Sequence, residues 1–332
     1  MKSLTMFRIS ILMFISSPCV IHSQLGIGLP IKLKLHAIGP EDVAFNGKGQ
    51  GPYTGVADGR ILEYYNDKFI DFATTSPFRT KEICDGTNDP NLQLTCGRPL
   101  GLEFHRRTGD LYIADINYGL LRVGLKGGLA TQLAAGVNGK NFSFTNAVAL
   151  DESTNTAYFI DSGKIFRTGN FTKVAQSGDT SGRLLKYEMN TGQVKVVLRR
   201  LSGPTGLAIS KDKTFLVISE FIGRKITKHI IKGPKAGLTQ TILKLEGQPD
   251  NVKWATSGGF WVAVNILKPP QPEQLIPMTE SIAVKFDING KILDKKNVTL
   301  GYPNSFSGYL EYFGKAYTGS LVPDFLGVYR LK

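Results

Sequence analysis

One short motif recurs along the chain and limits the folds that the sequence can adopt. Each copy begins with a turn, continues into a mainly apolar strand, and is followed by further short strands separated by turn signals. The copies begin at Pro40, Pro99, Thr145, Pro204, Pro249 and about Phe306, at intervals of roughly 45 to 60 residues. A repeat of this length, with three or four strands in each unit, is typical of a β-propeller.

Six copies predict an all-β fold, a single six-bladed β-propeller over residues 24–332. The segment from Gln24 to Leu35 is expected to add a strand to the last blade, which closes the ring and leaves no open sheet edge. A pair of β-sandwiches is the alternative, but it does not explain the repeated motif.

Residues 1–23 have the layout of a secretory signal peptide. Lys2 and Arg8 give a positive start, a mainly apolar stretch begins at Ile11, and the small residue Ser23 precedes Gln24. The stretch is too short to span a membrane, and an uncleaved anchor is the alternative. No later segment is long and apolar enough to span one, so we expect a soluble protein of the secretory pathway, vacuolar or extracellular.

The residues that remain after cleavage agree with this route. Cys84 and Cys96 enclose a polar loop, and in an oxidising compartment they predict a disulfide, because two cysteines alone make a poor metal site. Three Asn-x-Ser/Thr sequons lie in polar, turn-rich surroundings and predict N-glycosylation at Asn141, Asn170 and Asn297.

The formal net charge is +13, and its positive residues are scattered along the chain. No dense basic run with interleaved aromatic residues is present in the sequence, which argues against nucleic acid as a partner. We therefore expect a monomer with a solvated basic surface, without a membrane span, that acts on a small molecule.

In a propeller, the first strand of each blade lines a central channel, so polar residues at the starts of these strands converge at its mouth. Those residues are Glu41, Asn146, Thr205, Asp250 and Asn251. Carboxylate and amide oxygens suit a hard cation such as Ca²⁺, and we take Glu41, Asn146, Asp250 and Asn251 as candidate ligands. The alternative is that these side chains cap turns and bind water.

Several segments together resemble plant strictosidine synthase-like proteins over about residues 30 to 331. They are Cys96–Pro99, Asp110–Leu120, Gly127–Leu133, Ser181–Tyr187 and Gly247–Val264. The resemblance implies a six-bladed propeller with a secretory signal, a disulfide near Cys84 and Cys96, and a vacuolar destination.

Strictosidine synthase condenses tryptamine with the aldehyde secologanin in alkaloid biosynthesis and uses a glutamate of the last blade as acid and base. That glutamate follows a phenylalanine, which places its counterpart here at Ser307, after Phe306. A neutral hydroxyl is a poor base toward an amine, so the main proton-transfer group of the condensation is missing. Glu311 lies four residues further on, where the family carries a different acid.

The wider superfamily includes paraoxonase-type lactonases and arylesterases, propellers with Ca²⁺ at the channel mouth. Their ligand pattern matches Glu41, Asn146, Asp250 and Asn251, whereas Thr205 stands where another asparagine is expected. The resemblance therefore implies metal-assisted ester or lactone hydrolysis. A strictosidine synthase-type condensation and a non-catalytic binding propeller stay open as alternatives.

Other features of the sequence bear on the channel. Three histidines follow residue 23: His36 is within possible reach of the channel, His105 is expected on the surface, and His229 is expected in an outer strand. Two loops, residues 161–178 with Phe166 and Phe171 and the proline-rich residues 268–278, are each expected to be either a lid over the channel or a mobile surface loop.

Overall fold

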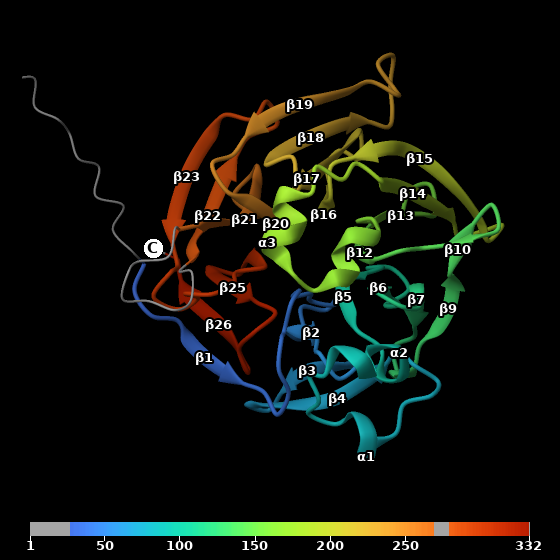
Figure 1. Ribbon diagram of the computed structural model, residues 1–332, viewed down its shortest axis with the longest axis vertical. Coiled ribbons are helices and arrows are strands. Elements are labelled where there is room, and N and C mark those ends of the chain that lie inside the picture. Colours follow the sequence, from blue (N-terminus) through green and yellow to red (C-terminus); the bar gives the residue numbers. More distant parts are fainter. Residues whose placement is uncertain (1–26, 269–278, 332) are drawn as a thin grey trace, which may run out of the picture.

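The computed structural model describes residues 27–268 and 279–331, and within them six four-stranded sheets stand in a ring (Figure 1). The prediction of a six-bladed β-propeller is confirmed. The expected signal peptide and most of the proline-rich loop at 268–278 lie outside the described residues.

Four of the blades share one topology, in which antiparallel strands run from the channel outward in chain order. From the innermost strand to the outermost, the second blade has β5 (Pro99–Phe104), β6 (Leu111–Asp115), β7 (Gly119–Val123) and β9 (Thr131–Ala134). The third has β12 (Thr145–Asp151), β13 (Thr156–Asp161), β14 (Gly182–Glu188) and β15 (Gln193–Leu201). The fourth has β16 (Pro204–Ile209), β17 (Phe215–Glu220), β18 (Lys225–Ile230) and β19 (Thr239–Lys244). The fifth has β20 (Gln248–Trp254), β21 (Phe260–Leu267), β22 (Thr279–Phe286) and β23 (Ile292–Asn297).

The sixth blade shows how the ring closes. It contains β24 (Gly308–Tyr312), β25 (Lys315–Gly319) and β26 (Phe325–Arg330), and its outer strand is β1 (Ile31–Lys34) from the start of the described chain. β1 pairs antiparallel with β26, from Ile31 opposite Val328 to Lys34 opposite Phe325. The expected closure by the N-terminal strand is therefore confirmed, and Figure 1 shows the two ends of the described chain side by side.

The first blade departs from the regular pattern. Its sheet contains β2 (Tyr53–Gly55), β3 (Arg60–Tyr65), β4 (Lys68–Thr74) and, parallel to β4, the short β8 (Gly128–Leu129). The inner position is taken by the segment around Glu41–Phe45, which forms only an isolated bridge between Ala44 and Tyr53. Our prediction of a regular strand here was wrong, although its place in the ring was right.

Burial decreases from the channel to the rim, which fits a ring of packed blades. β12 and β17 are buried at every position, because neighbouring blades cover both of their faces, whereas the outer strand β19 has no buried residue. The core lies between blades; Phe215 of the fourth blade, for example, packs against Phe260 of the fifth.

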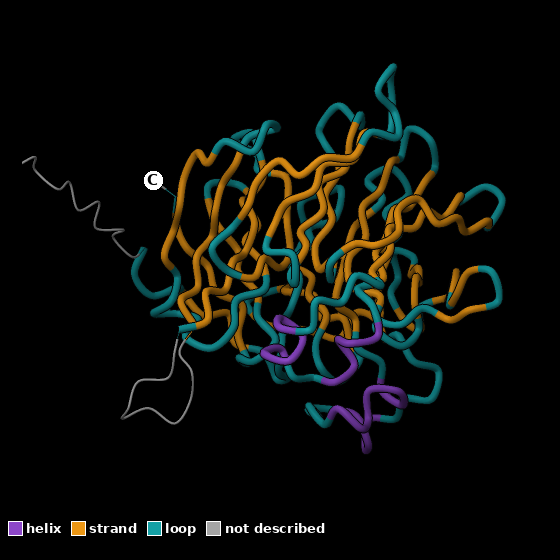
Figure 2. The backbone as a smooth tube through the Cα atoms, turned by 45° about the horizontal axis from the view of Figure 1, so that its top comes forward, coloured by secondary structure: helices purple, strands orange, loops and turns teal. Residues whose placement is uncertain are grey.

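Short helices gather on one side of the ring (Figure 2). They are α1 (Lys81–Cys84), η1 (Pro90–Leu92), α2 (Gln93–Cys96), η2 (Lys164–Thr168) and α3 (Phe171–Gln176), and a small hairpin of β10 (Gly136–Val137) and β11 (Lys140–Asn141) lies at the rim. The predicted disulfide is confirmed, since Cys84 of α1 is bonded to Cys96 of α2. No helix among the described residues has the length and apolar character needed to cross a membrane.

Candidate functional site

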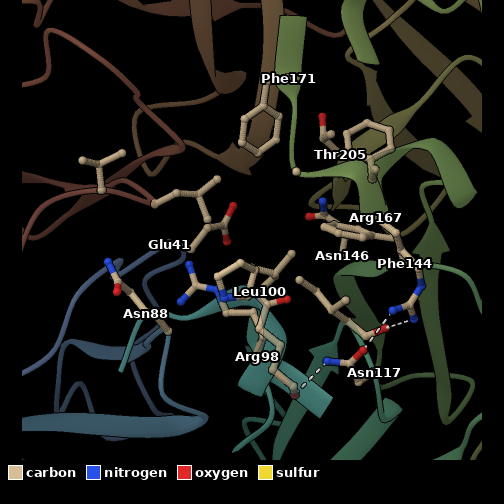
Figure 3. A pocket seen from close by; sticks show the side chains of 18 of the residues that line it. Glu41, Asn88, Arg98, Leu100, Asn117, Phe144, Asn146, Arg167, Phe171 and Thr205 are labelled. Atoms are coloured by element: carbon tan, nitrogen blue, oxygen red, sulfur yellow. Dashed lines mark hydrogen bonds between the residues drawn. The ribbon is translucent and has the colours of Figure 1, made fainter. Parts of the chain in front are cut away.

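A pocket of about 540 Å³ opens at the channel mouth, and residues of the short helices α2, η2 and α3 form part of its lining. Its polar lining includes Glu41, Asn146, Thr205 and Asp250, which come from the first, third, fourth and fifth blades. Figure 3 shows Glu41, Asn146 and Thr205 around this space. The structure thus brings together the residues that the sequence places at the starts of inner strands.

Local irregularities place these side chains. The ladder between the first two strands of a blade shifts register between Thr145 and Val148 in the third blade and between Pro249 and Val252 in the fifth. A bulge at the start of a strand re-aims its side chains, here toward the pocket. Gly206 assists, because a Cβ on it would lie 2.6 Å from the backbone nitrogen of Val252, so only glycine lets the fourth and fifth blades approach this closely.

The two carboxyl groups of the site are held differently. Glu41 is 2% exposed and accepts a hydrogen bond at Oε1 from Asn251 Nδ2 at 2.9 Å, whereas its Oε2 has no partner. Burial and then the nearby Asp250 carboxyl raise the pKa of Glu41 well above its ordinary value. Burial likewise raises the pKa of Asp250 to about 8, while the neighbouring Ser307 hydroxyl acts in the opposite direction.

Two buried side-chain oxygens of the pocket lining lack a hydrogen-bond partner, Glu41 Oε2 and Asn146 Oδ1, and the Ser307 Oγ beside Asp250 has none of normal geometry. Buried polar atoms are almost always satisfied, so such a group of acceptors fits a bound cation with oxygen ligands. Among the residues that the structure describes, no three His, Cys, Asp or Glu side chains group as metal ligands. A site here would therefore depend on amide or hydroxyl oxygens beside its two carboxylates.

Thr205 and Ser307, the other residues singled out at the mouth, contact the backbone of the fifth blade. The Thr205 hydroxyl donates to the backbone oxygen of Pro249 at 3.0 Å, so it ties the fourth blade to the fifth. Ser307 is fully buried just before β24, and its backbone oxygen accepts from the Asn251 amide at 2.9 Å. Ser307, the counterpart of the glutamate of strictosidine synthase, therefore lies beside the Asp250-Asn251 pair.

Glu311 is remote from this chemistry. It lies in β24 and accepts hydrogen bonds from the backbone and hydroxyl of Ser257, from the Thr256 hydroxyl and from the Trp261 indole at 2.7 to 2.9 Å. Burial opposes ionisation, but these donors outweigh it and lower the pKa of Glu311 to about 2. It is a structural carboxylate between the fifth and sixth blades.

The histidines do not contribute to the mouth. His36 is half exposed and faces Asp71 at 3.4 Å, so it does not reach the channel. His105 is 2% exposed and accepts a hydrogen bond from the Thr108 amide; our prediction that it lies on the surface was wrong, because its turn folds back over the side chain. His229 is buried in β18 and contacts the Thr239 hydroxyl at 2.8 Å.

Pocket residues that sequence reasoning missed include Arg98, Asn117 and Arg167, and the loop at 161–178 supplies part of the cover. η2 and α3 of that loop place Phe166 and Phe171 on the pocket, as expected for a lid. Arg98 directly precedes the Pro99 repeat start, and this position at the start of an inner strand was the available signal.

The predicted glycosylation sites are accessible to different degrees. Asn141 and Asn170 are exposed, and Asn297 is half buried at the end of β23. Asn170 also caps α3, because its side chain accepts from the Lys173 amide at 2.9 Å. Glycosylation itself stays a prediction.

Comparison with known proteins identifies the family. Family models described as strictosidine synthase and as the strictosidine synthase-like N-terminal region match residues 146–234 and 31–64. Strictosidine synthase-like 10 from Arabidopsis thaliana is 37% identical and covers 89% of this chain and 86% of its own length. Strictosidine synthase from Catharanthus roseus is 34% identical and covers 87% and 82%. The chain belongs to the strictosidine synthase-like family.

Solved structures share the fold at lower identity. A gluconolactonase from Xanthomonas campestris superposes with a TM-score of 0.64 at 15% identity and covers 91% of this chain and 89% of its own. A calcium-binding protein, regucalcin, from Agrobacterium tumefaciens gives 0.58 at 13% identity and covers 88% and 84%. These likenesses support the propeller architecture.

Proposed function

We propose that the protein is a metal-assisted hydrolase of small esters or lactones, with Ca²⁺ held at the channel mouth by Glu41, Asn146 and Asp250. Asn251 would complete the set or hold the Glu41 carboxylate through its hydrogen bond. We further propose that the protein works in the secretory pathway, in the vacuole or outside the cell, as residues 1–23 and the sequons suggest.

The observation that supports this proposal most strongly is the group of unpaired oxygens. Leaving buried acceptors unpaired is unfavourable by about 1–3 kcal/mol each, and a hard cation would satisfy several at once. The gluconolactonase and the calcium-binding regucalcin show that the same fold carries such activities in other proteins.

Each part of the site has a role in this scheme. Bound Ca²⁺ would polarise a carbonyl oxygen and make a bound water more acidic. Asn251 fixes the orientation of Glu41, and the Thr205 hydroxyl locks the backbone that carries Asp250. The phenylalanines of η2 and α3 shield the pocket, so charges inside it interact more strongly than in open water.

A strictosidine synthase-type condensation has less support in this chain. The position of the synthase glutamate is occupied by Ser307, which offers a buried hydroxyl, and Glu311 is held between two blades. We expect no product from tryptamine and secologanin. A non-catalytic binding propeller would keep the cation and lack turnover.

The test is hydrolysis of a panel of aryl esters and lactones by Ca²⁺-loaded protein. Asp250→Asn keeps the shape but removes a ligand charge, so we expect at least about a 100-fold loss of activity with an unchanged fold. Glu188→Gln, which alters a partly exposed carboxylate of β14 paired with Lys195, is the matched control and should retain activity. The proposal fails if the wild type hydrolyses none of the panel, or if Asp250→Asn is fully active.

A further inference from the structure

The guanidinium of Arg98 is the buried charge in the pocket that the proposed chemistry does not use. Arg98 is 4% exposed and lines the pocket near Glu41 (Figure 3). Its side chain makes one hydrogen bond, from Nη1 to the Gly39 backbone oxygen at 3.0 Å. Among the described residues no carboxylate forms an ion pair with its guanidinium, although Glu41 and Asp115 attract it through space, and Asp115 accepts from its backbone amide.

Arg167 lines the same pocket and provides a contrast. Its Nε donates to the Ser143 backbone oxygen at 2.5 Å, its Nη1 to Asn117 Oδ1 at 3.0 Å, and its Nη2 to the Ile116 backbone oxygen at 3.3 Å. The donors of Arg167 are therefore committed to the protein and hold η2 in place. Those of Arg98 are largely uncommitted, so they are available to a ligand.

A guanidinium removed from water needs an acceptor with matching geometry, and a carboxylate matches two of its parallel N–H groups. Glu41 attracts the Arg98 guanidinium through space, but neither Glu41 nor Asp250 forms an ion pair or a hydrogen bond with it, so its parallel N–H groups stay open to a ligand carboxylate. A cation held between those two acids would also offset their repulsion of an anionic ligand.

The opposite wall of the pocket is aromatic. Phe144 and Phe166 lie with ring centroids 5.4 Å apart, Phe166 and Phe221 5.9 Å apart, and Phe171 and Phe221 6.2 Å apart. Side chains of this kind accommodate an apolar, preferably planar body. The two walls together are suited to an amphipathic ligand with an anionic end.

We propose that the pocket selects small aromatic carboxylates, with the carboxylate bound to Arg98 and the apolar body against the lid phenylalanines. This inference rests on the proposed function only in what it says of the reaction, whose substrates would be esters or lactones that carry a free carboxylate. Binding itself requires no turnover, so the two proposals can fail separately.

The test is calorimetric binding of 3-phenylpropanoate and of its neutral amide, 3-phenylpropanamide, in saturating Ca²⁺. We expect the wild type to bind the acid at least about tenfold more tightly than the amide. Arg98→Gln should lose this preference, whereas Arg167→Gln should loosen η2 and weaken binding of acid and amide alike, so that the preference is kept. Arg98→Lys, which retains the charge without the fork, should keep part of the preference.

Several outcomes would overturn the proposal. They are equal binding of acid and amide by the wild type, binding of neither, or a preference that survives in Arg98→Gln and so arises from the cation alone. Thermal unfolding of each variant shows whether it is folded. If Arg98→Gln is not folded, Arg98→Lys decides, and an undiminished preference in that variant contradicts the bidentate contact.

Discussion

At the channel mouth two acidic side chains share a poorly solvated space, and each has a raised pKa. Burial is the first cause for both Glu41 and Asp250, and for Glu41 the Asp250 charge adds to it. Between the ordinary pKa of Asp250, 3.8, and its value of about 8 in the protein, the folded state holds a proton that the unfolded state has lost. The stability of metal-free protein must therefore fall as the pH rises through this window.

We predict that the melting temperature of metal-free protein decreases between pH 5 and pH 8. The free energy of unfolding should fall by a few kcal/mol at most over this range. Ca²⁺ bound as proposed would compete with the proton, so its stabilising effect should be larger at pH 8 than at pH 5. Asp250→Asn should weaken both trends. Melting curves with Ca²⁺ and with a chelator measure this, and a flat profile with an equal Ca²⁺ shift at both pH values would refute it.

Sequence reasoning brought together the residues of the mouth but treated Asp250 and Asn251 as equivalent. The bulge in β20 separates their roles, since Asp250 lines the pocket while Asn251 turns to Glu41. Arg98 was missed because a lone arginine before a strand resembles a surface charge. Its burial depends on contacts with the distant Gly39, which no local pattern reveals.

At the scale of elements, the helical loops decide the shape of the pocket. α1 and α2 are only four residues each, too short for a helical period to be visible in the sequence. The repeat identified the inner strands, yet the first of them is irregular. Glu41 accepts a hydrogen bond from the Asn251 side chain, and the Asp42 carboxylate accepts one from the Val43 amide, so neither contact belongs to a regular strand ladder. For the loop at 161–178 the sequence left a lid and a mobile surface loop open, and the structure places its Phe166 and Phe171 in the lining of the pocket.

The disulfide leads to a prediction at this scale. Gln93 and Leu94 of α2 line the pocket, and the Cys84–Cys96 bond joins α2 to α1. Replacing both cysteines by serine should lower the free energy of unfolding by about 2–4 kcal/mol and raise KM more than it lowers kcat, because a wall loosens while the proposed ligands stay. Denaturant melts and steady-state kinetics test this, with reductant added to wild type as the control. Unchanged stability and KM would contradict the assigned role.

At the scale of the whole molecule, the site exists only because the ring is closed. Glu41 belongs to the first blade, Asn146 to the third and Asp250 to the fifth, and β1 joins the last blade to the start of the chain. Repeats and spacing were enough to predict this ring, since every unit carries the same turn and strand signals. They could not predict which mouth oxygens remain unpaired, because that depends on contacts between blades.

Calorimetric titration of Ca²⁺ into metal-free folded protein tests the central claim most directly. The account predicts one Ca²⁺ bound per chain by the wild type and strongly weakened binding by Asp250→Asn, with the control Glu188→Gln, remote from the pocket lining, unchanged. No Ca²⁺ binding by the wild type, or equal binding by Asp250→Asn, would contradict it.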